Sequence, residues 1–338
     1  MDKKFLYLIL IFSLIINGVL FLELFVLDKK EGKKTTTKND VLALHLKKDV
    51  NEGLEIYKLL CEEKDGASCF IVGMLYSEDM DTSSNYQKGK EYKKKSCEMG
   101  NMLGCYYYAR HFIETDKEYH ERGRYYKKAC DKGNIAVSCN NYAVSLIKNT
   151  EKTEEALTYA KKACDLNGAN GCFNAGKLLK ERKDYKEAFQ YFKKGCDMGS
   201  GTNCNAAAML IDKKKDEVQG FELKESMNMY KRSCDLGCYR GCNNYATSMD
   251  DSNPEKKRIY EILSMIPEMA VYGYYNLACL YSKKGDKEKA ITHVKKALAE
   301  KPDLAEVIAM DKDFENIVNL QEFKNAIKSA KCCMMNLN

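Results

Sequence analysis

The sequence predicts an all-α fold built from stacked helix pairs. Only 3 of the 338 residues are proline, Lys, Glu, Ala, Leu and Tyr are abundant, and strand-type alternation of apolar and polar residues is hard to find. Cysteines recur in pairs at a nearly constant spacing, and small residues recur in register with them. Internal repeats of roughly 30 to 45 residues are typical of helix-pair arrays.

The N-terminal segment, residues 1–27, is predicted to be a signal-anchor or a signal peptide. Residues 5–27 carry one charge, Glu23, and a helix of this length would span the hydrocarbon core of a bilayer. Lys3 and Lys4 precede the apolar run, as in a signal sequence, and no convincing small-x-small cleavage site is present. We expect an uncleaved signal-anchor, with a cleaved signal peptide as the alternative.

Residues 28–40 are polar and rich in Lys and Thr, which predicts a tether. Lysines after the apolar run outnumber the two before it, namely Lys29, Lys30, Lys33 and Lys34. The positive-inside rule alone would therefore leave the remaining chain in the cytoplasm. The 16 cysteines favour the other side, because structural disulfides persist in oxidising compartments. We expect an array that is anchored to the membrane and faces the periplasm, or is secreted if the segment is cleaved.

Six cysteine pairs mark the predicted repeat region, residues 41–271. The two cysteines of a pair are eight residues apart in five pairs and nine in one, and successive pairs begin 36, 33, 34, 32 and 38 residues apart. A short turn, often with Gly, separates the two cysteines, and Gly supplies the left-handed conformation that ends a helix. Each pair therefore joins the end of one helix to the start of the next: Cys61/Cys69, Cys97/Cys105, Cys130/Cys139, Cys164/Cys172, Cys196/Cys204 and Cys234/Cys242.

We expect a disulfide in each pair, tying one repeat to its neighbour. Closing a loop of this length removes roughly 2.5 kcal/mol of unfolded-chain entropy. The alternatives are reduced core thiols or zinc ligands. Zinc sites favour about two to four residues between ligands and two converging pairs, and pairs one helix junction apart do not converge. No metal and no cofactor are therefore expected.

Small residues recur in register with the cysteines. One set follows the second cysteine by four residues, so it lies one helical turn further along the same face: Gly73, Ala109, Ala143, Gly176, Ala208 and Ala246. Another set precedes the first cysteine by eight residues, with Arg122 as the exception: Gly53, Gly89, Ala156, Ala188 and Ser226. Small side chains at fixed places allow neighbouring helices to approach closely.

The cysteine pattern stops after Cys242, but the helix pairs continue. One more helix pair is predicted for residues 272–302. At the junction that leads into it, Ile266 and Tyr274 would take the positions of the first and second cysteine. Residues 303–338 predict capping helices, because the end of a repeat stack needs a cover. The apolar side chains of this cap would be Phe314, Ile317, Val318, Leu320, Phe323 and Ile327.

The recurring pattern YxxACDxGxxxGCxxxA resembles Sel1-like repeats, and the cysteine pair resembles the cysteine-rich branch, the Helicobacter cysteine-rich proteins. Residues 272–302 resemble a tetratricopeptide helix pair. The resemblance implies a right-handed α-solenoid whose concave face is formed by the first helix of each pair, and residence in the periplasm or outside the cell. It also implies penicillin binding with weak β-lactamase activity, whereas Sel1-like proteins in general are adaptors for other proteins.

No catalytic residue can be assigned from the sequence. Ser145 and Lys148 fit the Ser-x-x-Lys motif of serine β-lactamases, but Ser-Asp-Asn and Lys-Thr-Gly do not occur, and Ser145 falls within a predicted helix. The histidines show no metal-binding spacing: His45, His111, His120 and His293. Weak β-lactamase activity therefore stays an alternative that only the resemblance implies.

Four cysteines lie outside the six pairs. Cys238 adds a thiol between Cys234 and Cys242, and Cys279 follows in the last helix pair. Cys332 and Cys333 are adjacent. They could form a disulfide with another chain or stay free thiols, and the sequence favours neither alternative. The pattern assigns no role to these four: Cys238, Cys279, Cys332 and Cys333.

A line of amides marks the expected ligand-binding surface. Two residues after the second-cysteine position come Asn141, Asn174, Asn244 and Asn276, and Tyr107 takes this place in one repeat. In tetratricopeptide proteins, which the chain resembles, such asparagines hydrogen-bond an extended peptide. The alternative is that these amides bridge neighbouring helices.

We predict a scaffold that binds a peptide, a protein or a peptidoglycan fragment on its concave face. Net charge is +6, and the 55 basic and 49 acidic residues are interleaved rather than gathered in blocks. This is typical of a solvated helix surface and speaks against nucleic-acid binding.

Overall fold

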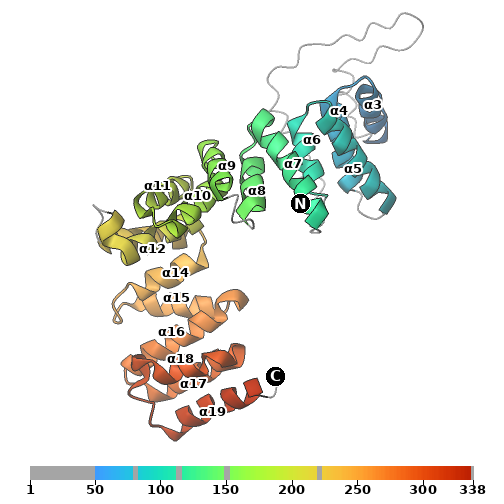
Figure 1. Cartoon of the computed structure of the whole chain (residues 1–338). Helices are drawn as coiled ribbons and strands as arrows, with labels where there is room; N and C mark the ends of the chain where they lie inside the picture. Colours follow the sequence, from blue (N-terminus) through green and yellow to red (C-terminus); the bar gives the residue numbers. More distant parts are fainter. Residues whose placement is uncertain (1–49, 79–82, 112–115, 148–152, 219–222, 336–338) are drawn as a thin grey trace, which may run out of the picture. The chain divides into compact units, whose positions relative to one another are not determined.

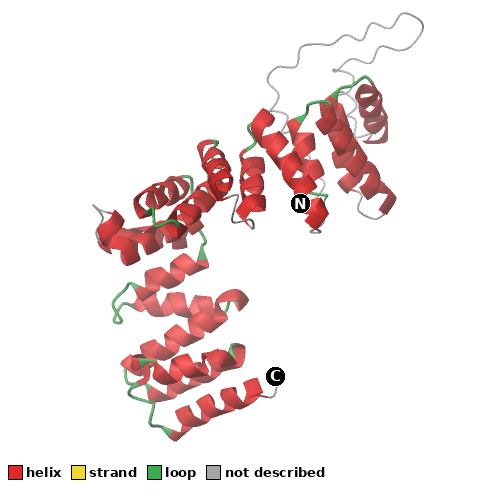
Figure 2. Cartoon of the chain, in the orientation of Figure 1, coloured by secondary structure: helices red, strands yellow, loops and turns green. Residues whose placement is uncertain are grey.

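A computed structural model describes residues 50–335 with four internal gaps, at 79–82, 112–115, 148–152 and 219–222. Within these residues the chain forms α-helices and short 3-10 helices joined by loops, with no strand (Figure 2). The predicted all-α stack of paired helices is confirmed. The predicted anchor (1–27) and tether (28–40) lie outside the described residues.

The chain divides into two compact units, residues 1–125 and 126–338. The described helices of unit 1 are α3 (Val50–Glu62), α4 (Gly66–Glu78), α5 (Ser83–Glu98), α6 (Met102–Ala109) and the first part of α7 (Asp116–Gly133). Unit 2 continues with α8 (Ala136–Ile147), α9 (Thr153–Asp165), α10 (Ala169–Glu181), α11 (Tyr185–Asp197), α12 (Gly201–Val218), α13 (Leu223–Asp235), α14 (Tyr239–Thr247), α15 (Pro254–Ser264), η2 (Pro267–Met269), α16 (Ala270–Lys283), α17 (Lys287–Glu300), η3 (Pro302–Leu304), α18 (Ala305–Met310), η4 (Lys312–Phe314) and α19 (Gln321–Met335).

Even-numbered helices from α4 to α16 are called A helices here, and odd-numbered helices from α3 to α17 are called B helices. Within unit 2 the A helices α10, α12, α14 and α16 each pack against the B helices that precede and follow them in sequence (Figure 1). Successive A helices from α8 to α14 also contact one another. The A helices of unit 2 thereby pack against other A helices as well as against B helices.

A left-handed residue follows the B helix at each cysteine junction. At the junction of α11 and α12, for example, the Ser200 N–H donates to the Gly195 carbonyl at 3.1 Å across Gly199. The equivalent position has a positive φ in every cysteine junction, whether or not it is glycine: Lys64, Gly100, Asn134, Asn167, Gly199 and Gly237. This turn reverses the chain within a few residues and brings the two cysteines of a pair together.

All six predicted cysteine pairs are bonded in the structure: Cys61–Cys69, Cys97–Cys105, Cys130–Cys139, Cys164–Cys172, Cys196–Cys204 and Cys234–Cys242. Each bond links the last turn of a B helix to the first turns of the next A helix. The Cα atoms of a pair lie 4.3–4.7 Å apart. Whether such a bond counts as within a repeat or between repeats depends only on where a repeat is taken to begin.

This spacing leaves little room beside the sulfur atoms. A Cβ placed on Gly171 would lie 2.5 Å from the Ala163 Cβ, and one placed on Gly241 would lie 2.5 Å from the Ser233 Cβ. Where the B helix carries glycine instead, at Gly195, the A helix fills the space with Asn203. The Asn203 amide donates to the Ala169 carbonyl of the preceding A helix at 3.0 Å. Residues next to the cysteines are thus complementary in size across each junction.

At the first junction without a disulfide, the structure corrects the predicted register. At a disulfide junction, a Cβ added to Gly171 would lie 2.7 Å from the backbone nitrogen of Cys164, the first cysteine of its pair. At this junction, a Cβ added to Gly273 would lie 2.3 Å from the backbone nitrogen of Ser264. Ser264, rather than Ile266, therefore takes the first-cysteine position. The turn is longer here because η2 is inserted. Ile266 instead packs on a core cluster with Tyr260 and Leu263. Apolar contacts hold this junction.

The small residues and the cap occupy the core of unit 2. Side chains of Ala143, Ala175, Ala188 and Ala207 are fully buried in one cluster with Phe189. At the C-terminal end, a second cluster joins α16 and α17 to the predicted cap side chains, which are buried or half-buried: Phe314, Ile317, Val318, Leu320, Phe323 and Ile327. No helix within the described ranges is long and apolar enough to cross a membrane.

The tight junction predicts that Gly171→Ala destabilises the oxidised protein by about 1–3 kcal/mol, because the added methyl overlaps Ala163 and the backbone of Cys164. Urea unfolding monitored by circular dichroism measures the loss. Asn170→Ala, at the exposed neighbouring position, is the control and should change stability by less than about 0.5 kcal/mol. Equal effects of the two substitutions would contradict the close approach.

Candidate functional site

Three of the four predicted asparagines hydrogen-bond across neighbouring A helices of unit 2. The Asn174 amide donates to the Asn140 carbonyl oxygen at 2.8 Å, linking α10 to α8. Asn244 donates to Asn205 at 2.8 Å and Asn276 to Asn243 at 2.7 Å, which link α14 to α12 and α16 to α14. Each of these three asparagines thus bridges to the preceding A helix.

The acceptors form a second set, which the sequence analysis missed. Asn140, Asn205 and Asn243 each directly follow the second cysteine of a pair, so their regular place was readable from the sequence. Asn140 and Asn205 are buried, whereas the donors are half-buried. Asn141 is half-buried as well, and its carbonyl oxygen accepts a hydrogen bond from the Asn140 amide at 3.4 Å.

Unit 1 has aromatic rings at the corresponding two positions. Tyr107 of α6 packs on Phe70 of α4, with ring centroids 5.2 Å apart, and the Arg110 guanidinium lies 5.6 Å from the Tyr107 centroid. Tyr107 is therefore a packing residue between A helices, in the place that asparagine donors take in unit 2. On neighbouring A helices, the residue directly after the second cysteine of one pair contacts the residue two after the second-cysteine position of the next. Both are asparagines in the amide bridges of unit 2, and both are aromatic in the Phe70–Tyr107 contact.

The amides lie on a partly exposed face of the A helices, called the helix-A face here. Residues four before and three after the asparagine position, which is Ala206 on α12, lie at helical spacing on this side of the A helices; on α16 the second of them is Cys279, which is buried. Val137 and Val144 are exposed on α8, with 41% and 44% of their surface accessible, and Tyr272 is exposed on α16 at 53%. Polar exposed members are Asn170, Lys177, Thr202, Arg240 and Thr247. The helix-A face thus combines amides with apolar and cationic side chains.

Ion pairs connect the B helices instead. A basic residue two before the first cysteine pairs with the acidic residue one after the preceding first cysteine: Lys162–Asp131 at 3.4 Å, Lys194–Asp165 at 2.7 Å and Arg232–Asp197 at 3.2 Å. These side chains are a third to two-thirds exposed, so each pair contributes little to stability. Their regularity describes a charged solvent surface, distinct in composition from the helix-A face.

Ser145 has a local role. Its hydroxyl donates to the Tyr142 carbonyl of the same helix at 2.6 Å, and Lys148 lies outside the described residues. Of the histidines, His120 is exposed and His45 is outside the described residues, while His293 stacks on Tyr281 at 5.5 Å. These placements bring no histidine to Ser145 within the described chain.

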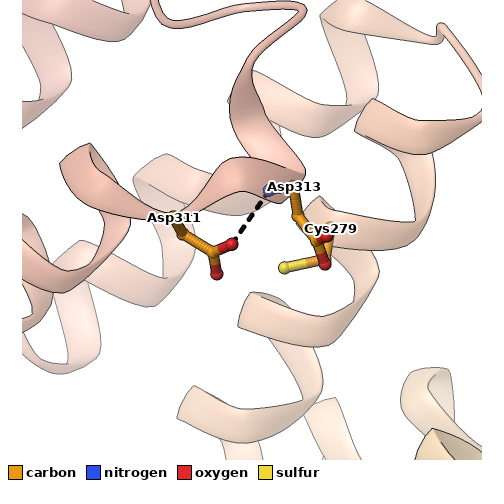
Figure 3. Close-up of side chains that lie close together, drawn as sticks. All are labelled: Cys279, Asp311 and Asp313. Atoms are coloured by element: carbon orange, nitrogen blue, oxygen red, sulfur yellow. Dashed lines mark hydrogen bonds between the residues drawn. The ribbon is translucent and has the colours of Figure 1, made fainter.

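Among the described residues, one group of three potential metal ligands converges, formed by Cys279, Asp311 and Asp313 (Figure 3). Asp311 accepts hydrogen bonds from the Tyr275 hydroxyl and, at 2.9 Å, from the Asp313 N–H. Asp313 pairs with Lys283 at 3.0 Å. Burial and the two carboxylates raise the pKa of the Cys279 thiol above its usual range, so it stays protonated. We interpret the group as a polar link between α16 and the cap.

We expect the free energy of unfolding to depend on pH through His111 of unit 1. Burial, followed by the charges of Lys93, Lys90 and Arg110, lowers the pKa of His111 from 6.5 to about 4. Between about pH 4 and pH 6.5 the unfolded chain binds more protons at His111 than the folded chain does. The contribution of His111 to the free energy of unfolding is therefore complete above pH 6.5 and decreases as the pH falls toward 4. His111→Gln should reduce the stability loss that urea unfolding measures between pH 7 and pH 4.5. An unchanged pH profile in this variant would count against the burial of a neutral imidazole.

The amide pairs predict a measurable coupling. In a double-mutant cycle, Asn205→Ala and Asn244→Ala should show an interaction energy of about 0.5–1.5 kcal/mol, because each substitution removes the same hydrogen bond. Urea unfolding of the oxidised protein measures it. Asn205→Ala combined with Asn276→Ala is the control cycle and should be additive, since these two amides bond to different partners. Additivity in both cycles would refute the amide bridge.

Comparisons with known proteins agree with this architecture. The Sel1 repeat family model matches residues 66–101, 124–134, 145–168 and 172–200, and the tetratricopeptide repeat model matches residues 271–304. No curated protein matches the sequence.

Two solved structures show the same fold. The crystal structure of c5321, a protective antigen of uropathogenic Escherichia coli strains with an SLR fold, has a TM-score of 0.66 at 16% identity, covering 87% of this chain and 71% of that chain. A Sel1 repeat protein from Oxalobacter formigenes has a TM-score of 0.54 at 16% identity, covering 66% of this chain and 94% of that chain. The chain therefore contains Sel1 repeats within residues 66–200 and a tetratricopeptide repeat at residues 271–304, and its fold is that of stacked, disulfide-linked helix pairs.

Proposed function

We propose that the chain is an extracytoplasmic scaffold that binds an extended peptide segment of a partner protein on the helix-A face of unit 2. The observation that carries this proposal is the series of half-buried amides at Asn141, Asn174, Asn244 and Asn276, which lie at the same position of α8, α10, α14 and α16, while α12 has Ala206 there. Exposed side chains at helical spacing flank these amides, and the exposed apolar ones are Val137 and Val144 on α8 and Tyr272 on α16.

The amide bridges leave hydrogen-bonding capacity for a ligand. An asparagine side chain has two N–H donors and a carbonyl acceptor, and the bridges between described A helices use one N–H each of Asn174, Asn244 and Asn276. The bridge also fixes the orientation of each amide, which lowers the entropy that ligand binding would cost. Packed helices lie about 8–10 Å apart, which corresponds to roughly three residues of extended chain. Where two successive A helices both carry the amide, as α8 with α10 and α14 with α16 do, their amides can contact a peptide about three residues apart.

Disulfides support a location outside the cytoplasm. Six bonds of this kind in one chain indicate an oxidising, extracytoplasmic compartment. The finer location rests on the sequence, in which residues 1–27 predict an anchor that leaves the array facing the periplasm or, after cleavage, a secreted protein. Membership of the cysteine-rich branch of Sel1-like proteins rests on the cysteine spacing in the same way.

Only one function is proposed, because the described contacts do not favour the hydrolase alternative. The Ser145 hydroxyl is engaged within its own helix. A peptidoglycan fragment remains a second ligand class for the same surface, since its peptide stem offers the same amide groups.

The proposal is tested by selecting displayed random 12-residue peptides against the oxidised chain and measuring their affinity by calorimetry. Val137→Asp and Tyr272→Ala should each weaken binding at least tenfold, because both alter exposed side chains of the helix-A face. Met310→Asp, at a site 77% exposed on α18, is the matched control and should leave affinity unchanged. Soluble peptidoglycan stem peptides are titrated in parallel. The proposal fails if no selected peptide is sensitive to Val137 or Tyr272.

A further inference from the structure

The last disulfide junction holds three cysteines within nine residues. Cys234 lies in the last turn of α13, Cys242 lies in the first turns of α14, and Cys238 is the N-cap residue of α14 between them. The Cα atoms of Cys234 and Cys242 are 4.3 Å apart, and Cys238 is a free thiol. A thiol is thus placed four residues from each sulfur of a disulfide, within one tight turn.

This disulfide is also the most accessible of the six. In the other five bonds, every cysteine is at most 3% exposed. Cys234 and Cys242 are both half-buried, and so is Cys238. A solvated thiolate can therefore form beside this bond, whereas the other bonds are shielded by the helices that they join.

Helix capping does not account for a cysteine at position 238. At two of the equivalent positions, Asp65 accepts from the Ala67 N–H at 3.2 Å and Asn101 accepts from the Leu103 N–H at 3.0 Å, whereas Gly168 has no side-chain cap. Cys238 makes no such side-chain hydrogen bond. It packs beside Gly201, where a serine of similar size would fit and would also cap the helix. The structure of the turn therefore does not require a thiol at this place.

We propose that Cys234, Cys238 and Cys242 form a thiol–disulfide exchange site. The Cys238 thiolate attacks the Cys242 sulfur, the Cys238–Cys242 bond forms, and the Cys234–Cys242 bond breaks. Cys234 leaves as a thiolate and takes up the proton that Cys238 released to solvent, so the step is redox-neutral. Attack on the Cys234 sulfur is the equivalent step and releases Cys242.

Exchange changes which elements are tied together. The Cys234–Cys242 bond joins α13 to α14, whereas a Cys238–Cys242 bond lies within the first turn of α14. Side chains four residues apart on a helix have Cβ atoms about 5–6 Å apart, and a disulfide needs about 4 Å, so a movement of one to two ångströms suffices. After attack on Cys242 no disulfide ties α13 to α14, and a Cys234 thiol is free for an external disulfide; attack on Cys234 instead leaves a Cys234–Cys238 bond and frees Cys242. The site is independent of the helix-A face.

Tryptic mapping of the full-length oxidised chain tests the proposal. Cleavage after Arg232, Arg240 and Lys256 separates Cys234 and Cys238 from Cys242. The chain is incubated at pH 6 and pH 8, quenched in acid and labelled with N-ethylmaleimide before digestion. We expect the label mainly on Cys238, with a fraction on Cys234 or Cys242 that approaches its final value at least threefold faster at pH 8 than at pH 6, because the thiolate is the attacking species.

Two variants make the result decisive. Cys238→Ser should remove the label from Cys234 and Cys242, and Cys279→Ser, which removes the buried free thiol, should leave the labelling pattern unchanged. Circular dichroism verifies that both variants fold. The exchange site is refuted if the label stays on Cys238 alone at both pH values. Label on Cys234 or Cys242 that persists in Cys238→Ser would overturn it as well.

Discussion

The rest of the structure depends on the close approach of two helix ends at each cysteine junction. Cα atoms 4.3–4.7 Å apart leave no space for two ordinary side chains beside the sulfurs. Three features follow from this distance: the left-handed residue in the turn, the glycine that precedes Cys105, Cys172 and Cys242, and the placement of Asn203 opposite Gly195 at another junction. The disulfide then removes unfolded conformations in which the two helix ends separate.

Contacts beyond the disulfides set the register of neighbouring repeats. On the A helices, amide pairs or ring pairs match the chemistry of two adjacent positions, as Asn174 with Asn140 and Tyr107 with Phe70 show. On the B helices, exposed ion pairs do the same with smaller energies. Because an amide bridge has directional hydrogen bonds, a shift of one residue would break it, whereas an apolar contact would tolerate such a shift.

A scaffold tied at regular intervals suits the binding of an extended partner. Each disulfide limits the motion of one junction, so the amides of successive A helices keep their relative places without a ligand. Affinity gained in this way comes from reduced ordering cost rather than from additional contacts. The junction at Cys238 differs from this rule, because a free thiol beside an accessible bond makes the tie between α13 and α14 exchangeable.

The sequence by itself determined the all-α class, the repeat period, the cysteine pairs and the small residues, because these features are periodic and local. It also placed one line of asparagines but not their partners Asn140, Asn205 and Asn243. Contacts between residues more than thirty positions apart depend on how the A helices lie against each other. Likewise, only the tertiary structure decided that Ser264 rather than Ile266 faces Gly273, since the inserted η2 turn shifts the register. Only the tertiary structure shows that the Cys234–Cys242 disulfide is more exposed than the other five. Neighbouring helices set the solvent exposure of a sulfur atom, and the spacing of cysteines in the chain does not.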